Sequence, residues 1–593
     1  MLRLLLRQLL GARAGKSAAH DAEPIAVPDR LHSCIDQAAQ CAGAGDHGAA
    51  AEHYRESLGL QPLDSRIWCN LGAELDAIGQ VDEAERAFRR ALELDPELAQ
   101  GWNNVGRLLQ LKGRPTESQS CYRKAAALVD GGANRPLWLL IYNNWGLLLC
   151  NQGRPHEAVA LYRKALTEYE QAPDLVSNLL LTMQYVEGCT QAEAFAEHVA
   201  YARRFEAPLK GNWRPHSNTY ASGARLKIGY VSPDFRAHAV ACFIEPVLAH
   251  HDREQIEIYC YCCHSVSDKV TLRLKSLVEH WRDISTISDD DAEKQIREDG
   301  IDILIDLAGH TAGGRMRIFA RKPAPVQVTW LGYPCTTGLS SMDYRITDAH
   351  ADPIGMSEQY HSETLYRLPD TFDCYGPPQD APAVGALPAL ARGGITFGSF
   401  NNLAKISAEV RALWAQVLLA VPGSRLLLKT VSLADTETRQ RLIDEFAKHG
   451  VGGERLILAS RDATDFEHLN RYNQIDIGLD PFPYNGVTTS FDALWMGVPV
   501  VTLEGSRFIS RMGLSMLTNL GMTELIARTP QDYVATAARL AGDLGRLAAI
   551  RARLRERMMN SVLSDAKRFT LNLEQAYRKM WASCCAGSRE EAR

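Results

Sequence analysis

The sequence has no long uninterrupted apolar run and no strong excess of either charge. None of its 593 residues belongs to a stretch of about 18 uninterrupted apolar residues, which a membrane-spanning helix would need. The 65 Lys and Arg against 71 Asp and Glu give a net charge of −6, and no basic stripe marks a nucleic-acid surface. We therefore expect a soluble, cytoplasmic protein that binds neither membranes nor nucleic acids.

The N-terminal segment is apolar and basic, but it does not match a secretory signal. Arg3 and Arg7 interrupt the apolar core that a signal peptide would need, and the segment is too short to cross a bilayer. The basic residues that follow add some transit-peptide character. We expect residues 1–31 to be a poorly ordered extension, and its role stays open at this point.

Cysteine is present, but not in pairs that would hold a metal. The 14 cysteines are scattered, and neither Cys260–Cys263 nor Cys584–Cys585 has the two-by-two spacing of a zinc site. A secreted disulfide framework is not expected at this chain length. The acidic run Ser288–Asp291 precedes a predicted helix, where negative charge favours the helix N-terminus. We therefore predict free thiols and no metal site.

The N-terminal third contains an internal repeat with an offset of 34 residues. Turn glycines, aromatic residues and Asn-x-Gly tripeptides share this offset: Gly45, Gly79 and Gly113; Tyr54, Phe88 and Tyr122; Asn70–Gly72 and Asn104–Gly106. After an insertion at Asp130–Arg135, the series continue with Asn144–Gly146, Gly153 and Tyr162. This pattern resembles the tetratricopeptide repeat, two helices joined at a glycine turn. We expect four units over residues 32–175, then a helical cap and connection over 176–222.

Such repeats stack into a superhelix with a concave groove, which predicts a protein or extended peptide as partner. The asparagines Asn70, Asn104 and Asn144 are candidates for lining that groove, although asparagine in a first helix can equally bond local backbone. The alternative is a structural array that self-associates into a homo-oligomer.

Downstream of the repeats, short apolar runs alternate with helical stretches, which is typical of parallel sheets. The predicted strands are Leu226–Val231, Ile256–Cys262, Ile303–Leu307 and Val326–Trp330, then Ile395–Phe400, Leu426–Lys429, Leu456–Leu458, Ile475–Leu479 and Val498–Leu503. We predict two doubly wound, Rossmann-like domains, residues 223–375 and 395–563, joined by a linker over 376–394. A long helix over Ala566–Ala582 dominates the C-terminal helix and tail, residues 564–593.

The segment Asp480–Asp492 joins a predicted buried strand to a predicted helix. Its prolines and glycine force a tight connection, and its hydroxyl-bearing residues open the helix, where backbone N–H groups lack intrahelical partners. A strand, a bent loop and a helix start form an anion site that a diphosphate would fit. Asp492 lies about a turn into the helix, within reach of a sugar hydroxyl.

Two more constellations follow the predicted strands of the second domain. Lys405 follows the strand ending at Phe400, where an ammonium can neutralise charge that develops on a departing diphosphate; the alternative is a solvated surface lysine. His468 and Arg471 are three residues apart and share one face of a predicted helix. Arg471 contacts phosphate or forms a surface ion pair.

Two histidines follow predicted strands of the first domain. His238 comes after the strand ending at Val231, and His310 after the strand ending at Leu307. A neutral imidazole can accept a proton near neutral pH, so either histidine is a candidate general base or orienting group. A single histidine is more often structural, but two at strand ends of one sheet strengthen the functional interpretation.

Together these residues resemble the O-linked N-acetylglucosamine transferase family, with its bacterial and Spindly-type relatives. The resemblance covers almost the whole chain and rests on four motifs: Ile228–Phe235, Arg321–Gln327, Trp330–Pro334 and Asp480–Thr489. It implies a tetratricopeptide superhelix followed by an α/β GT-B catalytic region of two Rossmann-like domains. It also implies inverting transfer of N-acetylglucosamine from UDP-N-acetylglucosamine to Ser or Thr of proteins, with no required metal or other cofactor.

The resemblance further implies roles for donor-binding residues. Lys405 would hold the diphosphate, with Asn402 beside it at the nucleotide. His468 and Arg471 would contribute to the uridine and phosphate pocket. The remaining contacts would come from the helix start, with Thr488 and Thr489 on phosphate and Asp492 on the ribose.

The resemblance determines the catalytic residue and the donor sugar nucleotide less closely than it determines the donor-binding residues. His238 matches the family's long-proposed catalytic histidine, while Val487 stands in the donor pocket where relatives often carry glycine or histidine. Three alternatives therefore stay open: GDP-fucose to Ser or Thr, UDP-glucose to Asn, and a non-catalytic tetratricopeptide scaffold. Neither the acceptor protein nor the general base is predicted.

Overall fold

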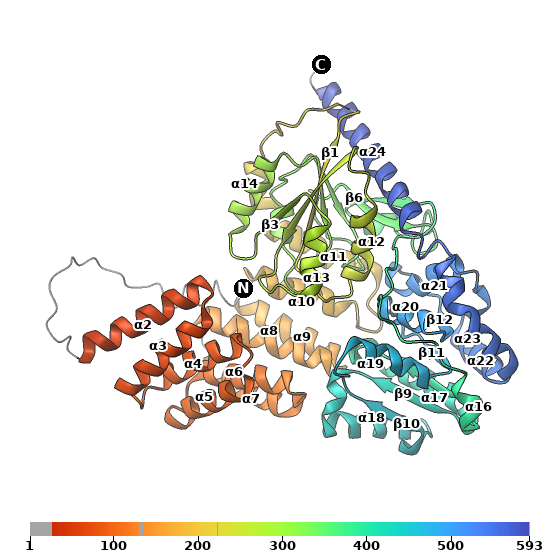
Figure 1. Cartoon of the computed structure of the whole chain (residues 1–593), viewed down its shortest axis with the longest axis horizontal. Coiled ribbons are helices and arrows are strands. Elements are labelled where there is room, and N and C mark those ends of the chain that lie inside the picture. The colour runs from red at the N-terminus through yellow and green to blue at the C-terminus, as the bar shows by residue number, and fades with distance from the viewer. Residues whose placement is uncertain (1–26, 130–133, 222, 592–593) are drawn as a thin grey trace. The chain divides into compact units, whose positions relative to one another are not determined.

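The computed structural model describes residues 27–129, 134–221 and 223–591 (Figure 1). Most of the expected N-terminal extension and the insertion residues 130–133 lie outside the described residues. The chain divides into two compact units, which we describe separately: residues 1–152 with 161–168, and residues 153–160 with 169–593. None of the helices in the described part of the chain has the length and hydropathy needed to span a bilayer.

The first unit is built from paired helices. In chain order they are α2 (Val27–Ala44), α3 (His47–Leu60), α4 (Ser65–Ala77), α5 (Val81–Leu94), α6 (Ala99–Leu111), α7 (Pro115–Val129), α8 (Arg135–Asn151) and the second part, residues 161–168, of α9 (Pro155–Glu168). Gly45, Gly79 and Gly113 sit at the turns within pairs with φ of 87°, 80° and 71°, a conformation that glycine adopts without steric cost. The predicted repeat is confirmed.

The second glycine series allows the helices of a pair to approach closely. A Cβ added at Gly72 would lie 2.7 Å from the Phe88 ring, and one at Gly106 would lie 2.9 Å from Tyr122. Both aromatic rings are buried. The 34-residue offset of glycine and aromatic residues therefore records one packing contact that recurs in successive repeats.

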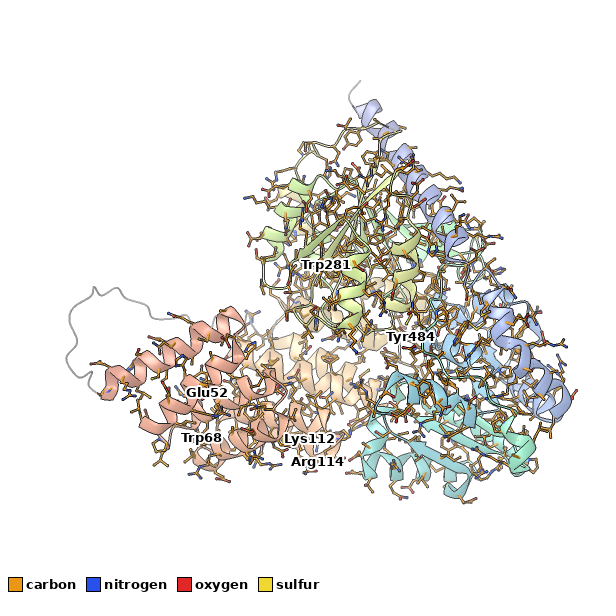
Figure 2. All side chains as sticks on the ribbon, viewed as in Figure 1. Glu52, Trp68, Lys112, Arg114, Trp281 and Tyr484 are labelled. Atoms are coloured by element: carbon orange, nitrogen blue, oxygen red, sulfur yellow. The ribbon has the colours of Figure 1, made fainter. Side chains whose placement is uncertain are left out.

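Two of the three groove-lining candidates form hydrogen bonds between consecutive first helices. The Asn104 amide contacts Cys69 Sγ at 3.6 Å, and Asn144 Nδ2 donates to Asn103 Oδ1 at 3.1 Å. A separate groove of about 600 Å³ is lined by residues of α3, α4 and α5, among them Leu58, Trp68 and three arginines. The first unit thus presents both amide side chains and a partly apolar groove. Trp68, one of the groove residues, is labelled in Figure 2.

The second unit begins with α10 (Pro173–Met183), α11 (Gln191–Phe205) and η1 (Ala207–Asn212), followed by a seven-stranded parallel sheet in the order β3-β2-β1-β4-β5-β6-β7. Its strands are β1 (Leu226–Ser232), β2 (Ile256–Cys262), β3 (His280–Asp283), β4 (Ile303–Asp306), β5 (Val326–Thr329), β6 (Tyr344–Asp348) and β7 (Thr364–Leu368). Its helices are α12 (Ala241–His250), α13 (Lys269–Ser276), α14 (Asp289–Asp299) and α15 (Met316–Phe319). As predicted, the acidic run opens a helix: Ser288 caps α14 by accepting the Asp291 N–H.

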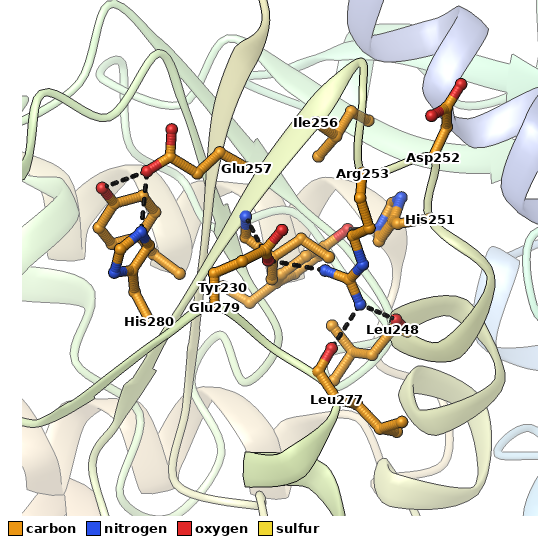
Figure 3. A network of polar contacts seen from close by, with 12 residues as sticks. Tyr230, Leu248, His251, Asp252, Arg253, Ile256, Glu257, Leu277, Glu279 and His280 are labelled. Atoms are coloured by element: carbon orange, nitrogen blue, oxygen red, sulfur yellow. Dashed lines mark hydrogen bonds and ion pairs between the residues drawn. The ribbon is translucent and has the colours of Figure 1, made fainter.

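The sequence did not indicate β3, β6 or β7, and β3 shows why. It is an edge strand with three polar residues and one apolar residue, Trp281, which packs on the core of the first sheet; charged side chains pair around it (Figure 3). His280 Nε2 lies 2.8 Å from Glu257 Oε1 of β2, and Arg253 Nη1 lies 2.8 Å from Glu279 Oε2. A search for apolar runs misses such a strand.

A second parallel sheet has the order β10-β9-β8-β11-β12-β13. Its strands are β8 (Thr396–Ser399), β9 (Arg425–Lys429), β10 (Leu456–Ala459), β11 (Ile477–Leu479), β12 (Val500–Leu503) and β13 (Ile526–Ala527). The helices around it are α16 (Pro388–Arg392), α17 (Ala408–Ala420), α18 (Thr436–Lys448), α19 (Asp465–Asn470), α20 (Thr488–Trp495), α21 (Met512–Asn519), α22 (Pro530–Ala541) and α23 (Leu544–Met559). The predicted fold class, helical repeats followed by two parallel-sheet α/β domains, is confirmed.

The last helix, α24 (Ala566–Glu591), returns to the first sheet (Figure 1). Its apolar residues, including Leu573 and Trp581, belong to the core that the first sheet forms. Tyr577 Oη lies 3.1 Å from the Tyr230 hydroxyl, so the helix is also tied to β1 by a buried hydrogen bond. The predicted long helix over Ala566–Ala582 is therefore confirmed, and it extends further, to Glu591.

Candidate functional site

The strand order of the second sheet places a switch point between β8 and β11. From β8 the chain winds outward through β9 and β10, then returns to the other side of β8 as β11. Ligands of doubly wound sheets bind outside the carboxyl ends of the strands at such a point. The loops after β8 and β11 carry Asn401–Lys405 and Asp480–Asp492, so the topology brings the two predicted constellations together.

Asp480 shapes the loop that follows β11. Its buried carboxylate accepts the Gly486 N–H at 2.7 Å and hydrogen bonds from the hydroxyls of Ser490 and Thr502 at 3.2 and 2.7 Å. Burial raises the pKa of Asp480 to about 6, whereas these hydrogen bonds act to lower it. One carboxylate thus fixes the loop to the start of α20.

Gly486 is required by the tight packing of this loop. A Cβ at this position would lie 2.6 Å from Thr489 Oγ1 and 2.7 Å from Ser490 Oγ. Thr489 Oγ1 in turn donates to Asn401 Oδ1 at 3.0 Å, which joins α20 to the loop after β8. Val487 and Thr488 lie at the start of α20, both partly buried, and Val487 packs against apolar neighbours.

Lys405 lies at the centre of this arrangement. Its Nζ donates to the Asn485 carbonyl at 2.8 Å and stands 4.1 Å from the centre of the Tyr484 ring. Burial lowers the pKa of Lys405 to about 8, although the Asp480 carboxylate attracts the ammonium. Asn402, three residues earlier, is exposed, and its side chain caps the turn η3 (Leu403–Lys405) by accepting the Ala404 N–H.

Asp492 is held from two sides. One carboxylate oxygen accepts the Tyr375 hydroxyl at 2.7 Å, and the other lies 3.6 Å from His468 Nε2. Tyr375 also stacks on Phe491, with ring centres 5.0 Å apart. Tyr375 lies at the C-terminal end of the first domain. Residues of both domains therefore orient this carboxylate.

His468 and Arg471 meet a lysine at the end of β9. The Lys429 ammonium contacts His468 Nδ1 and lies 2.5 Å from Asp462 Oδ2. Arg471 Nε donates to the other Asp462 oxygen at 2.9 Å. Hydrogen bonding from Arg471 holds the pKa of Asp462 low, at about 2. Of the two predicted interpretations of Arg471, the structure shows the ion pair, and it is partly buried.

His238 lies on the loop that leads into α12 and is exposed. Its Nδ1 accepts the Val240 backbone N–H at 3.3 Å and lies 3.6 Å from Asp234 Oδ1. Because a backbone amide can only donate, the neutral ring carries its proton on Nε2 and presents a donor. Burial of part of the ring lowers the pKa of His238, while Asp234 opposes this effect.

The His238 loop reaches the second domain through α12. Phe243 of α12 packs edge-on against Phe491 of α20, with ring centres 5.4 Å apart. The start of α12 therefore lies against the helix that carries Thr488, Thr489 and Asp492, and the loop that carries His238 directly precedes α12.

His310 is placed differently. Its side chain is fully buried, Nδ1 lies 3.0 Å from the Ser177 hydroxyl and Nε2 lies 2.9 Å from the Thr337 carbonyl. Both ring nitrogens are thus used inside the protein, and burial lowers the pKa of His310 to about 4. This geometry is that of a structural histidine that fastens α10 to the loop after β5, and it presents no nitrogen to a ligand.

The sequence analysis did not identify the roles of four residues of the site. These are Tyr375, Lys429, Asp462 and Tyr484, whose ring lies beside the Lys405 ammonium. Lys429 had a usable signal, because it ends a predicted strand just as Lys405 follows one. The contact of Tyr375 with Asp492 spans 117 positions and has no local signal. Within the described residues, no group of three or more His, Cys, Asp or Glu could hold a metal ion.

Comparison with known proteins places the chain in a family. The model of glycosyl transferase family 41 matches residues 203–376 and 386–573, and tetratricopeptide models match residues 65–98 and 97–171. The chain belongs to glycosyl transferase family 41. The family match covers both sheets, and the site described above lies within it.

Named relatives and a solved structure share this family region. The chain is 42% identical over 414 residues to a protein of Solanum lycopersicum named probable UDP-N-acetylglucosamine–peptide N-acetylglucosaminyltransferase SPINDLY, covering 69% of this chain and 44% of that protein. It is 34% identical over 378 residues to an Arabidopsis thaliana protein named probable UDP-N-acetylglucosamine–peptide N-acetylglucosaminyltransferase SEC. This match covers 62% of this chain and 38% of that protein. The chain thus spans less than half the length of these curated relatives.

The solved structure is a mutant O-GlcNAc transferase of Thermobaculum terrenum. It is 35% identical, has a TM-score of 0.81, and the match covers 95% of this chain and all of that one. The order of helical repeats followed by two parallel-sheet domains is therefore shared across the whole solved chain.

Proposed function

We propose that this protein is an inverting glycosyltransferase that moves N-acetylglucosamine from UDP-N-acetylglucosamine to Ser or Thr hydroxyls of proteins. The observation that carries the proposal is the position of Lys405, which lies beside the Asp480–Asp492 loop at the switch point of the second sheet. Family membership and the printed names of the relatives support the reaction class.

The donor diphosphate is expected to lie between Lys405 and the start of α20. There the ammonium, the Thr488 and Thr489 hydroxyls and the first N–H groups of the helix all favour negative charge. Asp492, oriented by Tyr375 and His468, is available to accept hydrogen bonds from ribose hydroxyls. The Lys405 ammonium and the helix N-terminus supply the positive charge that offsets the diphosphate.

In the transfer step, the acceptor oxygen attacks the anomeric carbon from the face opposite the diphosphate. The bond from that carbon to the diphosphate breaks, UDP leaves with the electron pair, and the proton of the acceptor hydroxyl passes to solvent water. Lys405 stabilises the charge that grows on the leaving group, an interaction stronger in the transition state than in the ground state. His238, with a donor at Nε2, orients the acceptor or sugar in this state.

The test combines binding and transfer. Thermal shift with UDP, GDP and their sugar derivatives identifies the base, because a ligand that binds the native state raises the melting temperature. Incubation with labelled donor and protein lysate, followed by mass spectrometry of modified peptides, identifies sugar and acceptor residue. Stabilisation by GDP but not UDP, or transfer of fucose or glucose, refutes the proposed donor. Absence of both nucleotide binding and transfer refutes the enzyme assignment.

A further inference from the structure

The contact between Lys429 and His468 determines which ring nitrogen of the histidine accepts a hydrogen bond. Lys429 ends β9, and its side chain is 7% exposed. One ammonium proton goes to Asp462 Oδ2, another points to His468 Nδ1, and the group lies 5.1 Å from the centre of the Phe400 ring. A lysine ammonium has three donors and no acceptor. Nδ1 of His468 must therefore be the acceptor in this contact.

An acceptor at Nδ1 determines the tautomer of the His468 ring. A neutral imidazole has one donor and one acceptor nitrogen, so the proton of His468 is on Nε2. A doubly protonated ring would direct an N–H at the ammonium, which the nearby positive charge opposes. Nε2 is the nitrogen on the Asp492 side, 3.6 Å from its carboxylate.

The neighbours of His468 agree with a neutral ring. The charged groups around it are Lys429, Arg471, Asp462 and Asp492, with Asp465 and Glu467 on its own helix. Lys429 and Arg471 share Asp462, and Glu467 caps α19 by accepting the N–H groups of Ala463 and Thr464. The rings of Phe400 and Tyr472 flank the imidazole at 5.9 and 5.7 Å.

We propose that Lys429 is a positioning residue that holds His468 as the neutral Nε2–H tautomer, so that the site presents a fixed hydrogen-bond donor to an oxygen of the bound nucleotide. The inference rests on the proposed function only in assuming that a nucleotide occupies this site. Arg471 and Asp462 then serve to hold Lys429 rather than to touch phosphate.

The first test reads the tautomer directly. Imidazole ¹⁵N shifts are recorded on the full chain with labelled histidine, and the His468 signals are assigned by their loss in a His468→Gln variant. We expect a protonated Nε2 and an unprotonated Nδ1 at pH 7 in the free protein. A protonated Nδ1 overturns the inference. This measurement needs neither catalysis nor nucleotide, so it decides the tautomer even if the proposed function fails.

The second test removes the donor at position 429. Lys429→Met should weaken UDP binding about tenfold at pH 7.5 by isothermal titration, the size of one lost hydrogen bond to an oriented group. Lys429→Arg, which keeps a charged donor, should stay within about threefold of the wild type. Lys227→Met is the matched control, because Lys227 is a partly buried lysine that donates to the Asp299 carbonyl in the first sheet. Unchanged UDP affinity in Lys429→Met overturns the inference.

A double variant separates positioning from a structural role. If Lys429 acts on the nucleotide through His468, adding Lys429→Met to His468→Gln should weaken UDP binding no further than His468→Gln alone. Losses of affinity that add in the double variant contradict the proposal.

Discussion

Replacing Lys405 by methionine should make the free protein more stable and the enzyme inactive. Methionine keeps most of the aliphatic stem and removes the charge. Burial lowers the Lys405 pKa from 10.5 to about 8, which corresponds to about 3 kcal/mol of unfavourable burial of the charged form. The lost hydrogen bond to Asn485 and the contact with the Tyr484 ring oppose this by about 1 kcal/mol each. The net expected gain is about 1 kcal/mol.

The sign of the pH dependence follows from the lowered pKa. Between about pH 8 and 10.5 the unfolded chain binds more protons at Lys405 than the folded protein, so the free energy of unfolding rises with pH in that window. Below pH 8 the destabilisation is fully present. The stability advantage of Lys405→Met is therefore largest at pH 7 and shrinks toward pH 10.

The assay compares wild type, Lys405→Met and the exposed control Lys448→Met by thermal unfolding without ligand, and by transfer from labelled donor. We expect a melting temperature about 2–4 °C higher for Lys405→Met at pH 7 and transfer lowered by about 10²–10³-fold. In the wild type, kcat/KM should fall above about pH 8 as Lys405 loses its proton. Lower stability with transfer within tenfold of the wild type would refute the reasoning.

Three further perturbations test separate parts of the structure. Gly486→Ala, which places a Cβ 2.6 Å from Thr489 Oγ1, should abolish UDP-induced thermal stabilisation while circular dichroism stays native; retained stabilisation would show that the loop can relax. Trp581→Ala, which removes a side chain buried on the first sheet, should cost about 3–5 kcal/mol in denaturant unfolding, against less than about 0.5 for the exposed Leu571→Ala; equal effects would contradict a core role for α24. His310→Ala should lower the melting temperature while kcat of the folded fraction stays within about threefold; a loss of kcat with unchanged stability would restore a catalytic role.

The strands found from sequence are those whose burial on both faces produces apolar runs. Strands β1, β4, β9 and β12 fall where Ile, Leu and Val cluster, so the two-sheet architecture was predictable. The edge strand β3 was not, because three of its four residues are polar and it contains no apolar run. Strand ends also predicted the site, since polar residues after β8 and β11 meet at the switch point. The same rule selected His310, because sequence position does not reveal that both its nitrogens are used internally.

The distribution of charge in the site favours one position for the proposed diphosphate. Three cations lie at the carboxyl edge of the second sheet: Lys405, Lys429 and Arg471. Lys429 and Arg471 share the Asp462 carboxylate, which lies 2.5 Å from one and 2.9 Å from the other. Lys405 instead donates to a neutral carbonyl and faces an uncharged ring. An incoming diphosphate therefore gains most beside Lys405, where its charge also relieves the unfavourable burial of the ammonium. The lysine that costs the free protein stability is thus the one that binding of the donor would stabilise.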